Sequence, residues 1–175
     1  STMVLKSGSL QEVVFDQQLN DTMDLVGVFM EKHREHGVDM SVVDSTGVGQ
    51  GVFHRIREMG YPIRGVAFNE KPNDEMFQNK KAELYWLERK WLLSGGRLKA
   101  NTGWSEWQNI KWNNKDGKVI IQPKEQLFRE GILSPNCVDA AVLTQAITDT
   151  TIRSNRNLQR GNVFQDKMLE VWRGN

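Results

Sequence analysis

Two aspartates lie where this sequence could hold a divalent metal ion. Asp44 ends the apolar run of residues 40–43, and Gly47, Gly49 and Gly51 follow it. The residue at the carboxyl end of a strand in an open parallel sheet faces the place where such sheets bind ligands. Glycines next to it let the backbone turn tightly and approach a phosphate group. Asp44 is therefore a candidate catalytic and metal-binding residue, and a glycine-rich turn that only caps the next helix is the structural alternative.

The second aspartate, Asp139, lies in the first turn of a predicted helix of small apolar residues that follows Ser134-Pro135-Asn136. The helix dipole alone favours an acid at this position. A carboxylate that faces the core from such a helix could also reach Asp44, and Asn136 lies three residues earlier on the same helix face. Hard divalent ions prefer oxygen ligands of this kind. The pattern therefore predicts a metal site made by Asp44, Asp139 and Asn136.

Two lysines and two glycines are candidates for contact with DNA. Lys80 and Lys81 lie on a long predicted helix and could bind phosphates, although a solvated helix face is the more common explanation of such residues. The backbone at Gly47 and Gly49 could approach the same phosphates. No Gly-Lys-Ser or Gly-Lys-Thr follows these glycines, so the turn is not the phosphate-binding loop of a nucleotide hydrolase.

Composition limits the classes of protein to which the chain can belong. Of its 175 residues, 38% are hydrophobic and 26% are charged, which is typical of a folded globular domain. The formal net charge is +1, so a DNA-binding surface has to be a local patch. The single cysteine excludes an intrachain disulfide and favours a reducing, intracellular compartment. No apolar run approaches the roughly 20 residues of a membrane span.

The elements that must position these residues form an α/β fold, with a mixed sheet flanked by helices. An antiparallel hairpin should come first, because two short apolar runs are joined by Ser7-Gly8-Ser9. A strand, a helix and a second strand then follow in the pattern of a parallel crossover. The elements predicted in this half are strands at 3–6, 12–15, 40–44 and 63–68, and helices at 22–36 and 52–59.

The second half of the chain is predicted to be mainly helical. Its predicted elements are a long helix at 75–93, an irregular stretch at 97–118, a strand at 118–121, and helices at 124–130 and 137–149. We expect residues 1–150 to form one domain. Residues 151–175 should be a polar, basic tail with a short helix at 164–172.

Several segments, taken in order, are characteristic of a known family. They are residues 42–51 (Val-Val-Asp-Ser-Thr-Gly-Val-Gly-Gln-Gly), 65–69 (Gly-Val-Ala-Phe-Asn), 77–86 (Phe-Gln-Asn-Lys-Lys-Ala-Glu-Leu-Tyr-Trp), 124–127 (Lys-Glu-Gln-Leu), 131–132 (Gly-Ile) and 134–141 (Ser-Pro-Asn-Cys-Val-Asp-Ala-Ala). Across residues 3–147 they resemble the nuclease domain of phage large terminases. The matching features are its second acidic motif, its next strand with the Asn-Lys-Arg-Ala-Glu helix, and its closing lysine and Ser-Pro-Asp segment.

The resemblance implies an RNase H-like fold in which acidic clusters bind two Mg²⁺ or Mn²⁺ ions and cut DNA. Asp44 matches the second acidic position and Asp139 the third. Asn136 replaces an acid that is common in the Ser-Pro-Asp motif, a departure that alters one metal position. Lys124 would lie near the scissile phosphate and stabilise its charge.

The resemblance also implies that part of the family's nuclease domain lies outside this sequence. The family's first acidic residue belongs to a central strand that precedes the hairpin, and no acid precedes Glu12 here. We therefore hypothesise a nuclease domain that lacks its first, central strand, with an incomplete metal site and a fragment that is inactive for that reason. The gap in the sheet would be closed by direct pairing, filled by a strand of a partner chain, or left distorted.

For its biology, the resemblance implies an endonuclease that cuts concatemeric double-stranded viral DNA during genome packaging. The full protein would carry an N-terminal ATPase domain and act with the small terminase and the portal ring. It would work in the host cytoplasm, as a product of a phage or a prophage, with no membrane partner. No Walker motif occurs in the sequence, so the ATPase motor is not part of it.

Three other functions compete with this interpretation. Another RNase H-like enzyme, such as a resolvase, would share the chemistry and prefer branched DNA. A non-catalytic module would dock DNA or the portal through the basic C-terminal segment. A nucleotide-binding α/β domain would use the glycine turn, but it lacks the lysine that binds phosphate. Two carboxylates more than about 10 Å apart could not share a two-metal site, whose ions lie about 4 Å apart.

Overall fold

A hairpin begins the fold. The computed structural model describes residues 1–19 and 21–148. β1 (Thr2–Ser7) and β2 (Leu10–Asp16) pair antiparallel around Gly8, whose φ of 56° lies in the region that favours glycine. β5 (Arg97–Leu98) pairs in parallel with the other edge of β2. The predicted hairpin is therefore confirmed.

The next segment is a capped helix. α1 (Thr22–His36) begins after Asp21, whose side chain accepts a hydrogen bond from the Met23 amide. It ends at Gly37, which adopts the left-handed conformation. Both ends agree with the prediction, because local cap residues determine them.

A parallel strand pair follows α1. β3 (Ser41–Asp44) and β4 (Ile63–Val66) pair in parallel, and α2 (Val48–Glu58) connects them. α2 packs on α1 through a small core of Val26, Val52 and Ile56. The predicted strand–helix–strand unit is confirmed, although its helix begins four residues earlier than expected.

The long helix begins later than predicted. α3 (Lys80–Leu93) starts after Asn79, whose side chain accepts a hydrogen bond from the Ala82 amide. The residues just before it form bends and a turn, and Phe77 among them forms a β-bridge with Val119. The prediction of a helix from residue 75 was wrong since this pairing joins residues that are far apart in sequence.

Residues 97–118 are more regular than expected. Besides β5, they contain the 3-10 helix η1 (Thr102–Asn109) and β6 (Trp112–Lys115). β6 pairs antiparallel with β7 (Lys118–Ile121) around Asp116 and Gly117, whose φ values of 52° and 79° suit a tight hairpin turn. All four residues of β6 are exposed, so the strand has no apolar alternation to reveal it in the sequence.

Two further helices complete the described chain. They are α4 (Lys124–Arg129) and α5 (Asn136–Leu143), and the 3-10 turn η2 (Thr144–Ala146) follows α5. The helix predicted at 137–149 is therefore shorter in its α-helical part. The tail predicted at 151–175 lies outside the described residues.

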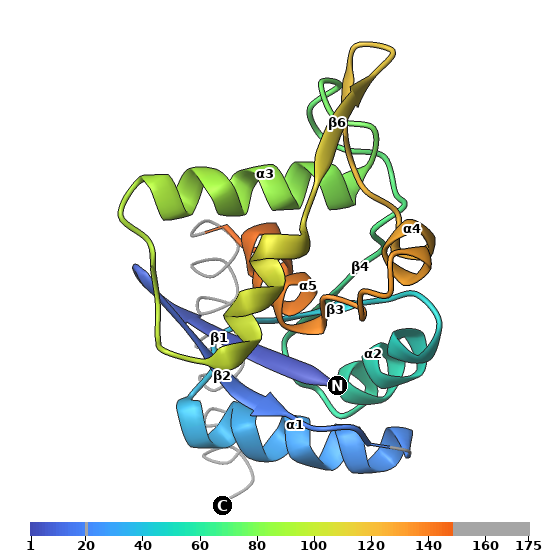
Figure 1. Ribbon diagram of the computed structural model, residues 1–175. Helices are drawn as coiled ribbons and strands as arrows, with labels where there is room; N and C mark the ends of the chain where they lie inside the picture. Colours follow the sequence, from blue (N-terminus) through green and yellow to red (C-terminus); the bar gives the residue numbers. More distant parts are fainter. Residues whose placement is uncertain (20, 149–175) are drawn as a thin grey trace, which may run out of the picture.

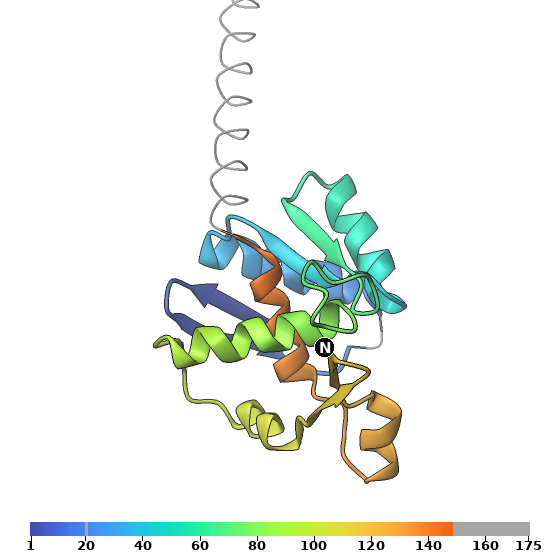
Figure 2. The same cartoon turned by 90° about the horizontal axis from the view of Figure 1, so that it is seen from above.

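The main core surrounds α5. Val138, Val142 and Leu143 pack with Leu84 and Tyr85 of α3. α5 crosses α3 on one side and lies against β1 on the other (Figures 1 and 2). In Figure 1, α3 lies along one side of the strands and α1 along the opposite side.

Buried polar contacts join the two ends of the described chain. The Gln11 amide nitrogen donates to Glu88 at 3.1 Å and to the Thr144 hydroxyl at 2.9 Å. Lys6 donates to the Gln145 side chain at 2.9 Å. β1 and β2 are thereby tied to α3 and to the end of α5.

The strands form three small sheets instead of one mixed sheet. Their orders are β1–β2–β5, β3–β4 and β6–β7, so β1 and β3 are both edge strands among the described residues. The predicted mixed α/β fold with strands flanked by helices is confirmed, and among the described residues β1 and β3 do not pair with each other. No helix within residues 1–19 and 21–148 is both long and apolar enough to cross a membrane.

Candidate metal centre

Asp139 lies at the centre of a charged cluster. It is on the first turn of α5 and only 7% exposed. The Tyr85 hydroxyl donates to its Oδ1 at 2.6 Å, and the Lys81 ammonium lies 3.3 Å from the same oxygen. The Lys124 ammonium lies 2.7 Å from Oδ2. One carboxylate thus holds together α3, α4 and α5.

The start of α5 is fixed by an acid from a distant segment. The Glu106 carboxylate of η1 accepts hydrogen bonds from the backbone amides of Cys137 at 2.8 Å and Val138 at 3.0 Å. An acceptor at a helix N-terminus satisfies amides that have no partner within the helix. Burial raises the pKa of Glu106, and these two amides lower it. The contact orients the turn that carries Asp139.

Asp44 is held by a local turn at the end of β3. Its Oδ1 accepts hydrogen bonds from the Thr46 amide at 3.1 Å and the Thr46 hydroxyl at 2.7 Å. Such a turn fixes the side chain of an aspartate relative to its own backbone. Within residues 1–19 and 21–148, Thr46 alone donates to this carboxylate, so Oδ2 stays open to other ligands.

The glycines after Asp44 are required by the backbone. A Cβ at Gly49 would lie 1.8 Å from the carbonyl oxygen of Asp44, so the first turn of α2 can lie on the end of β3 only with glycine there. Gly47 precedes α2 with a φ of 55° and ψ of −127°, which is a conformation that glycine tolerates. These residues bring α2 close to the predicted metal ligand.

Both aspartates act electrostatically on Lys81. Burial lowers the pKa of Lys81, Asp139 and Asp44 raise it, and the neighbouring Lys124 lowers it. Burial also raises the pKa of Tyr85 well above its usual value, and Asp139 raises it further. Tyr85 is therefore a protonated donor at any physiological pH.

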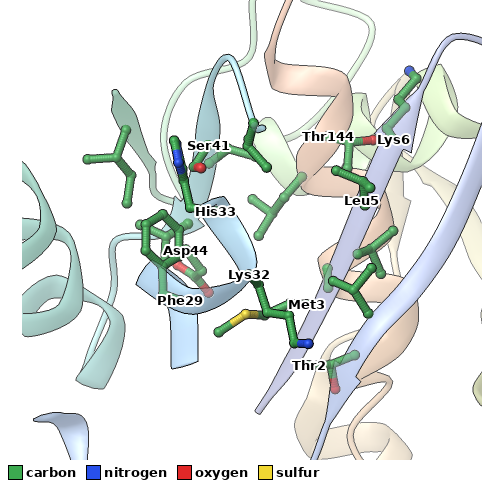
Figure 3. A pocket seen from close by; sticks show the side chains of 18 of the residues that line it. Thr2, Met3, Leu5, Lys6, Phe29, Lys32, His33, Ser41, Asp44 and Thr144 are labelled. Carbon is green, nitrogen blue, oxygen red and sulfur yellow. The ribbon is translucent and has the colours of Figure 1, made fainter. Parts of the chain in front are cut away.

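One cavity joins the predicted site residues. It has a volume of about 740 Å³, and Asp44, Lys124, Asn136 and Asp139 all line it. Figure 3 shows the cavity between β1 and β3, with Asp44 on its wall. Both aspartates therefore line one cavity.

Lys80 lies in a different place from the other predicted residues. It is 6% exposed and pairs with Glu83, which also accepts hydrogen bonds from the amides of Asn73 and Asp74. A buried lysine with an internal partner has a structural role, and this burial argues against the predicted contact between Lys80 and DNA.

The sequence did not identify Tyr85 or Glu106 as site residues. It predicted that Lys81 contacts DNA phosphates. Lys81 and Tyr85 are four residues apart on α3, so they lie on one helix face and both contact Asp139. That spacing was a usable signal for Tyr85. Glu106 had none, because it contacts α5 across 31 residues of chain.

The donor set suits an oxygen-liganded divalent ion. Asp44 offers an open carboxylate oxygen, Asp139 a second carboxylate and Asn136 an exposed amide. In the part of the chain that the structure describes, no group of three or more histidine, cysteine, aspartate or glutamate side chains is placed to hold a metal. The described residues thus supply two acids, and two lysines already neutralise one of them.

Comparison with known proteins identifies the fold. No family model and no curated protein sequence matches the chain. A solved structure does match, with a TM-score of 0.67 and 20% identity over 79% of this chain and 78% of the other. It is a lysine-to-alanine variant of the nuclease domain of the large terminase subunit gp2 of bacterial virus Sf6, with manganese and β-thujaplicinol. The chain therefore has the RNase H-like fold of a large terminase nuclease domain.

Proposed function

We propose that this chain is the nuclease portion of a large terminase and belongs to a divalent-metal-dependent DNA endonuclease. One observation carries the proposal: Asp44 and Asp139, which match the second and third acidic positions in the sequence resemblance, line the same cavity. The structural neighbour contains manganese, which fits a donor set of carboxylate oxygens.

Each residue of the cluster has a distinct role in this proposal. Asp44 and Asp139 would hold Mg²⁺ or Mn²⁺, with Asn136 as a further oxygen ligand. When bound, such ions supply an activated water and stabilise the leaving oxygen of a phosphodiester. Lys124, whose side chain is 37% exposed, would place positive charge next to the scissile phosphate. Tyr85 is a positioning residue that orients Asp139.

The proposed substrate is double-stranded DNA, cut from viral concatemers during packaging. The backbone at Gly47 and Gly49, next to Asp44, would approach a phosphate, and Lys81 would balance charge beside Asp139. In the full protein, an N-terminal ATPase domain, the small terminase and the portal ring are the proposed partners. The site of action would be the host cytoplasm, with a phage or prophage as source.

The test measures Mn²⁺ binding and cleavage of supercoiled plasmid by the same protein. Asp44→Asn and Asp139→Asn should each weaken Mn²⁺ binding at least tenfold and abolish any Mn²⁺-dependent nicking. Asp116→Asn is the matched control, because Asp116 is exposed in the β6–β7 turn and asparagine tolerates its positive φ.

Mn²⁺ binding that is equal in all three variants and the parent would overturn the proposal. A strong preference for four-way junctions over plasmid would assign the site to a resolvase instead. Binding that depends on both aspartates, without nicking, would fit a metal site in which two acids are too few for catalysis.

A further inference from the structure

A group of aromatic and basic side chains lies where the β6–β7 hairpin meets α3. Trp112 of β6 packs edge-on against Trp86 of α3, with ring centroids 5.3 Å apart. The Arg89 guanidinium, three residues further along α3, lies 5.2 Å from the centroid of the Trp86 ring. Figure 1 shows the hairpin running past α3 and away from the other strands. We call these three side chains, Trp86, Arg89 and Trp112, the tryptophan–arginine surface.

Packing within the fold explains only part of this group. Trp86 is partly buried and also packs with the ring of Phe77. Trp112 is 57% exposed although its ring already contacts Trp86, so more than half of its surface faces solvent. A tryptophan that only anchors a hairpin turns its large apolar surface inward. The exposed part of the Trp112 ring is therefore available to a planar group from another molecule.

The exposed charges of α3 and the hairpin are positive on balance. Four exposed basic residues of these two elements form no ion pair in the described part of the chain, and they are Arg89, Lys90, Lys115 and Lys118. Asp116, in the hairpin turn, offsets one of them. Lys111, next to Trp112, is already neutralised by Glu130 at 2.9 Å. The surroundings of the exposed ring therefore attract a negatively charged partner.

An exposed indole ring beside unpaired cations fits an unpaired nucleotide strand. Aromatic side chains stack on the faces of unpaired bases, while arginine and lysine side chains contact the phosphates. In a duplex the base faces are covered by the neighbouring base pairs, so the exposed ring would gain no stacking there. An acidic peptide would use the cations but not the ring, and an apolar peptide would use the ring but not the cations.

We infer that the tryptophan–arginine surface binds single-stranded DNA. One base stacks on the exposed part of the Trp112 ring, and Arg89 contacts a neighbouring phosphate. Lys115 and Lys118, which pair with each other at the end of the hairpin, contact phosphates further along the strand. Trp86 is a positioning residue, because its ring holds Trp112 on one side and Arg89 on another.

The surface lies a short chain distance from the proposed metal site. Trp112 pairs with Ile121 of β7, and Lys124 follows Ile121 by three residues, which span at most about 11 Å. The Lys124 ammonium in turn lies 2.7 Å from Asp139. A strand held at Trp112 would therefore keep a frayed or nicked end beside the metal site. This link, and the choice of DNA over RNA, rest on the proposed function, whereas the binding surface itself does not.

The test measures the fluorescence anisotropy of a fluorescein-labelled oligothymidylate of about 15 nucleotides, in EDTA so that no metal contributes. We expect saturable binding that Trp112→Ala weakens about tenfold, because the variant loses the stacked base. Trp112→Phe keeps an aromatic ring on Trp86 and should bind within about threefold of the parent. Met23→Ala is the control, since Met23 is 54% exposed on α1, on the opposite side of the strands from α3, and it should bind as the parent does.

The salt dependence of binding separates stacking from charge. For a single strand, the slope of log affinity against log salt concentration changes by about 0.7 for each phosphate contact. Arg89→Gln should reduce the slope by about that amount. Trp112→Ala should leave the slope unchanged while it weakens binding at every salt concentration. A slope that Arg89→Gln leaves unchanged would contradict the inferred contact between Arg89 and a phosphate.

Three results would overturn the inference. The first is no saturable binding of the oligothymidylate, or equal binding by the parent and Trp112→Ala. The second is a duplex of the same length that binds as tightly and shows the same loss in Trp112→Ala, which would assign the surface to double-stranded DNA. The third is binding of an oligouridylate more than about tenfold tighter, which would assign it to RNA. Failure of the proposed function would show elsewhere, as Mn²⁺ binding that does not depend on Asp44 and Asp139.

Discussion

Replacing Tyr85 with phenylalanine tests whether the buried hydroxyl orients Asp139 for metal binding. The substitution removes one oxygen and leaves the ring in its packing against Trp107 and the core of α5. Asp139 Oδ1 then loses its 2.6 Å donor and retains the Lys81 ammonium at 3.3 Å. The carboxylate would be held by charge alone, without a neutral donor of fixed direction.

The size of the effect follows from the geometry. A hydrogen bond to a charged group contributes about 1.5–3 kcal/mol, so loss of this one should weaken Mn²⁺ binding by about 10- to 100-fold. The same loss should lower the free energy of unfolding by about 1–2 kcal/mol, because two lysines still compensate the buried charge. Neither effect needs a change in the backbone.

The assay is titration with Mn²⁺ followed by electron paramagnetic resonance, in which bound Mn²⁺ loses the six-line signal of the free ion. Tyr61→Phe is the matched control, since Tyr61 is the chain's other tyrosine and contacts the rings of Phe29 and His33 instead of Asp139. If Tyr85→Phe and Tyr61→Phe bind Mn²⁺ as tightly as the parent, the positioning role assigned to Tyr85 is wrong.

Two further substitutions test the supports of the site, both by urea unfolding. Gly49→Ala should lower the free energy of unfolding by about 3 kcal/mol, because its Cβ would lie 1.8 Å from the Asp44 carbonyl oxygen. Gly51→Ala is the control in the same helix, because the nearest atom to its Cβ would be Thr22 Cγ2 at 3.9 Å. It should be neutral or raise the free energy of unfolding by up to about 1 kcal/mol. Equal effects of the two substitutions would refute the clash at Gly49. Burial raises the pKa of Glu88. In the pH range above the unfolded value of 4.5, the folded state therefore keeps a proton that the unfolded state releases. The free energy of unfolding accordingly falls as the pH rises through that range. Glu88→Gln should remove this dependence and gain stability relative to the parent between pH 4.5 and 7, and parallel pH profiles of the two proteins would contradict the assignment.

The elements that the sequence predicted well have local causes. α1 was predicted with its bounds because Asp21 and Gly37 cap it, and the β3–α2–β4 unit because apolar runs alternate with glycine turns. Asp44 and Asp139, a strand end and a helix start, line one cavity, as expected for two places where side chains converge in α/β folds. Each of these inferences needed only residues close in sequence.

The failures all involve contacts between distant residues. The start of α3 was missed beside the bridge of Phe77 with Val119, and Glu106 was missed as a contact of the first turn of α5. Lys80 carries the same charge as Lys81 and is its neighbour, but only the fold decides that one pairs with Glu83 and the other with Asp139. Helical periodicity turns the two lysine side chains about 100° apart, but it does not predict which residue each one contacts.

The ties between Gln11 and Thr144 and between Lys6 and Gln145 have a consequence for how the protein folds during synthesis. They join residues 133 and 139 positions apart, and α5 packs on the first strand of the domain. A nascent chain that ends before α5 can form the β1–β2 hairpin and the α1–α2 core, but it cannot bury Gln11 or cover β1. Until α5 emerges from the ribosome, the apolar side chains of β1 that α5 packs against stay uncovered, which favours association with other chains.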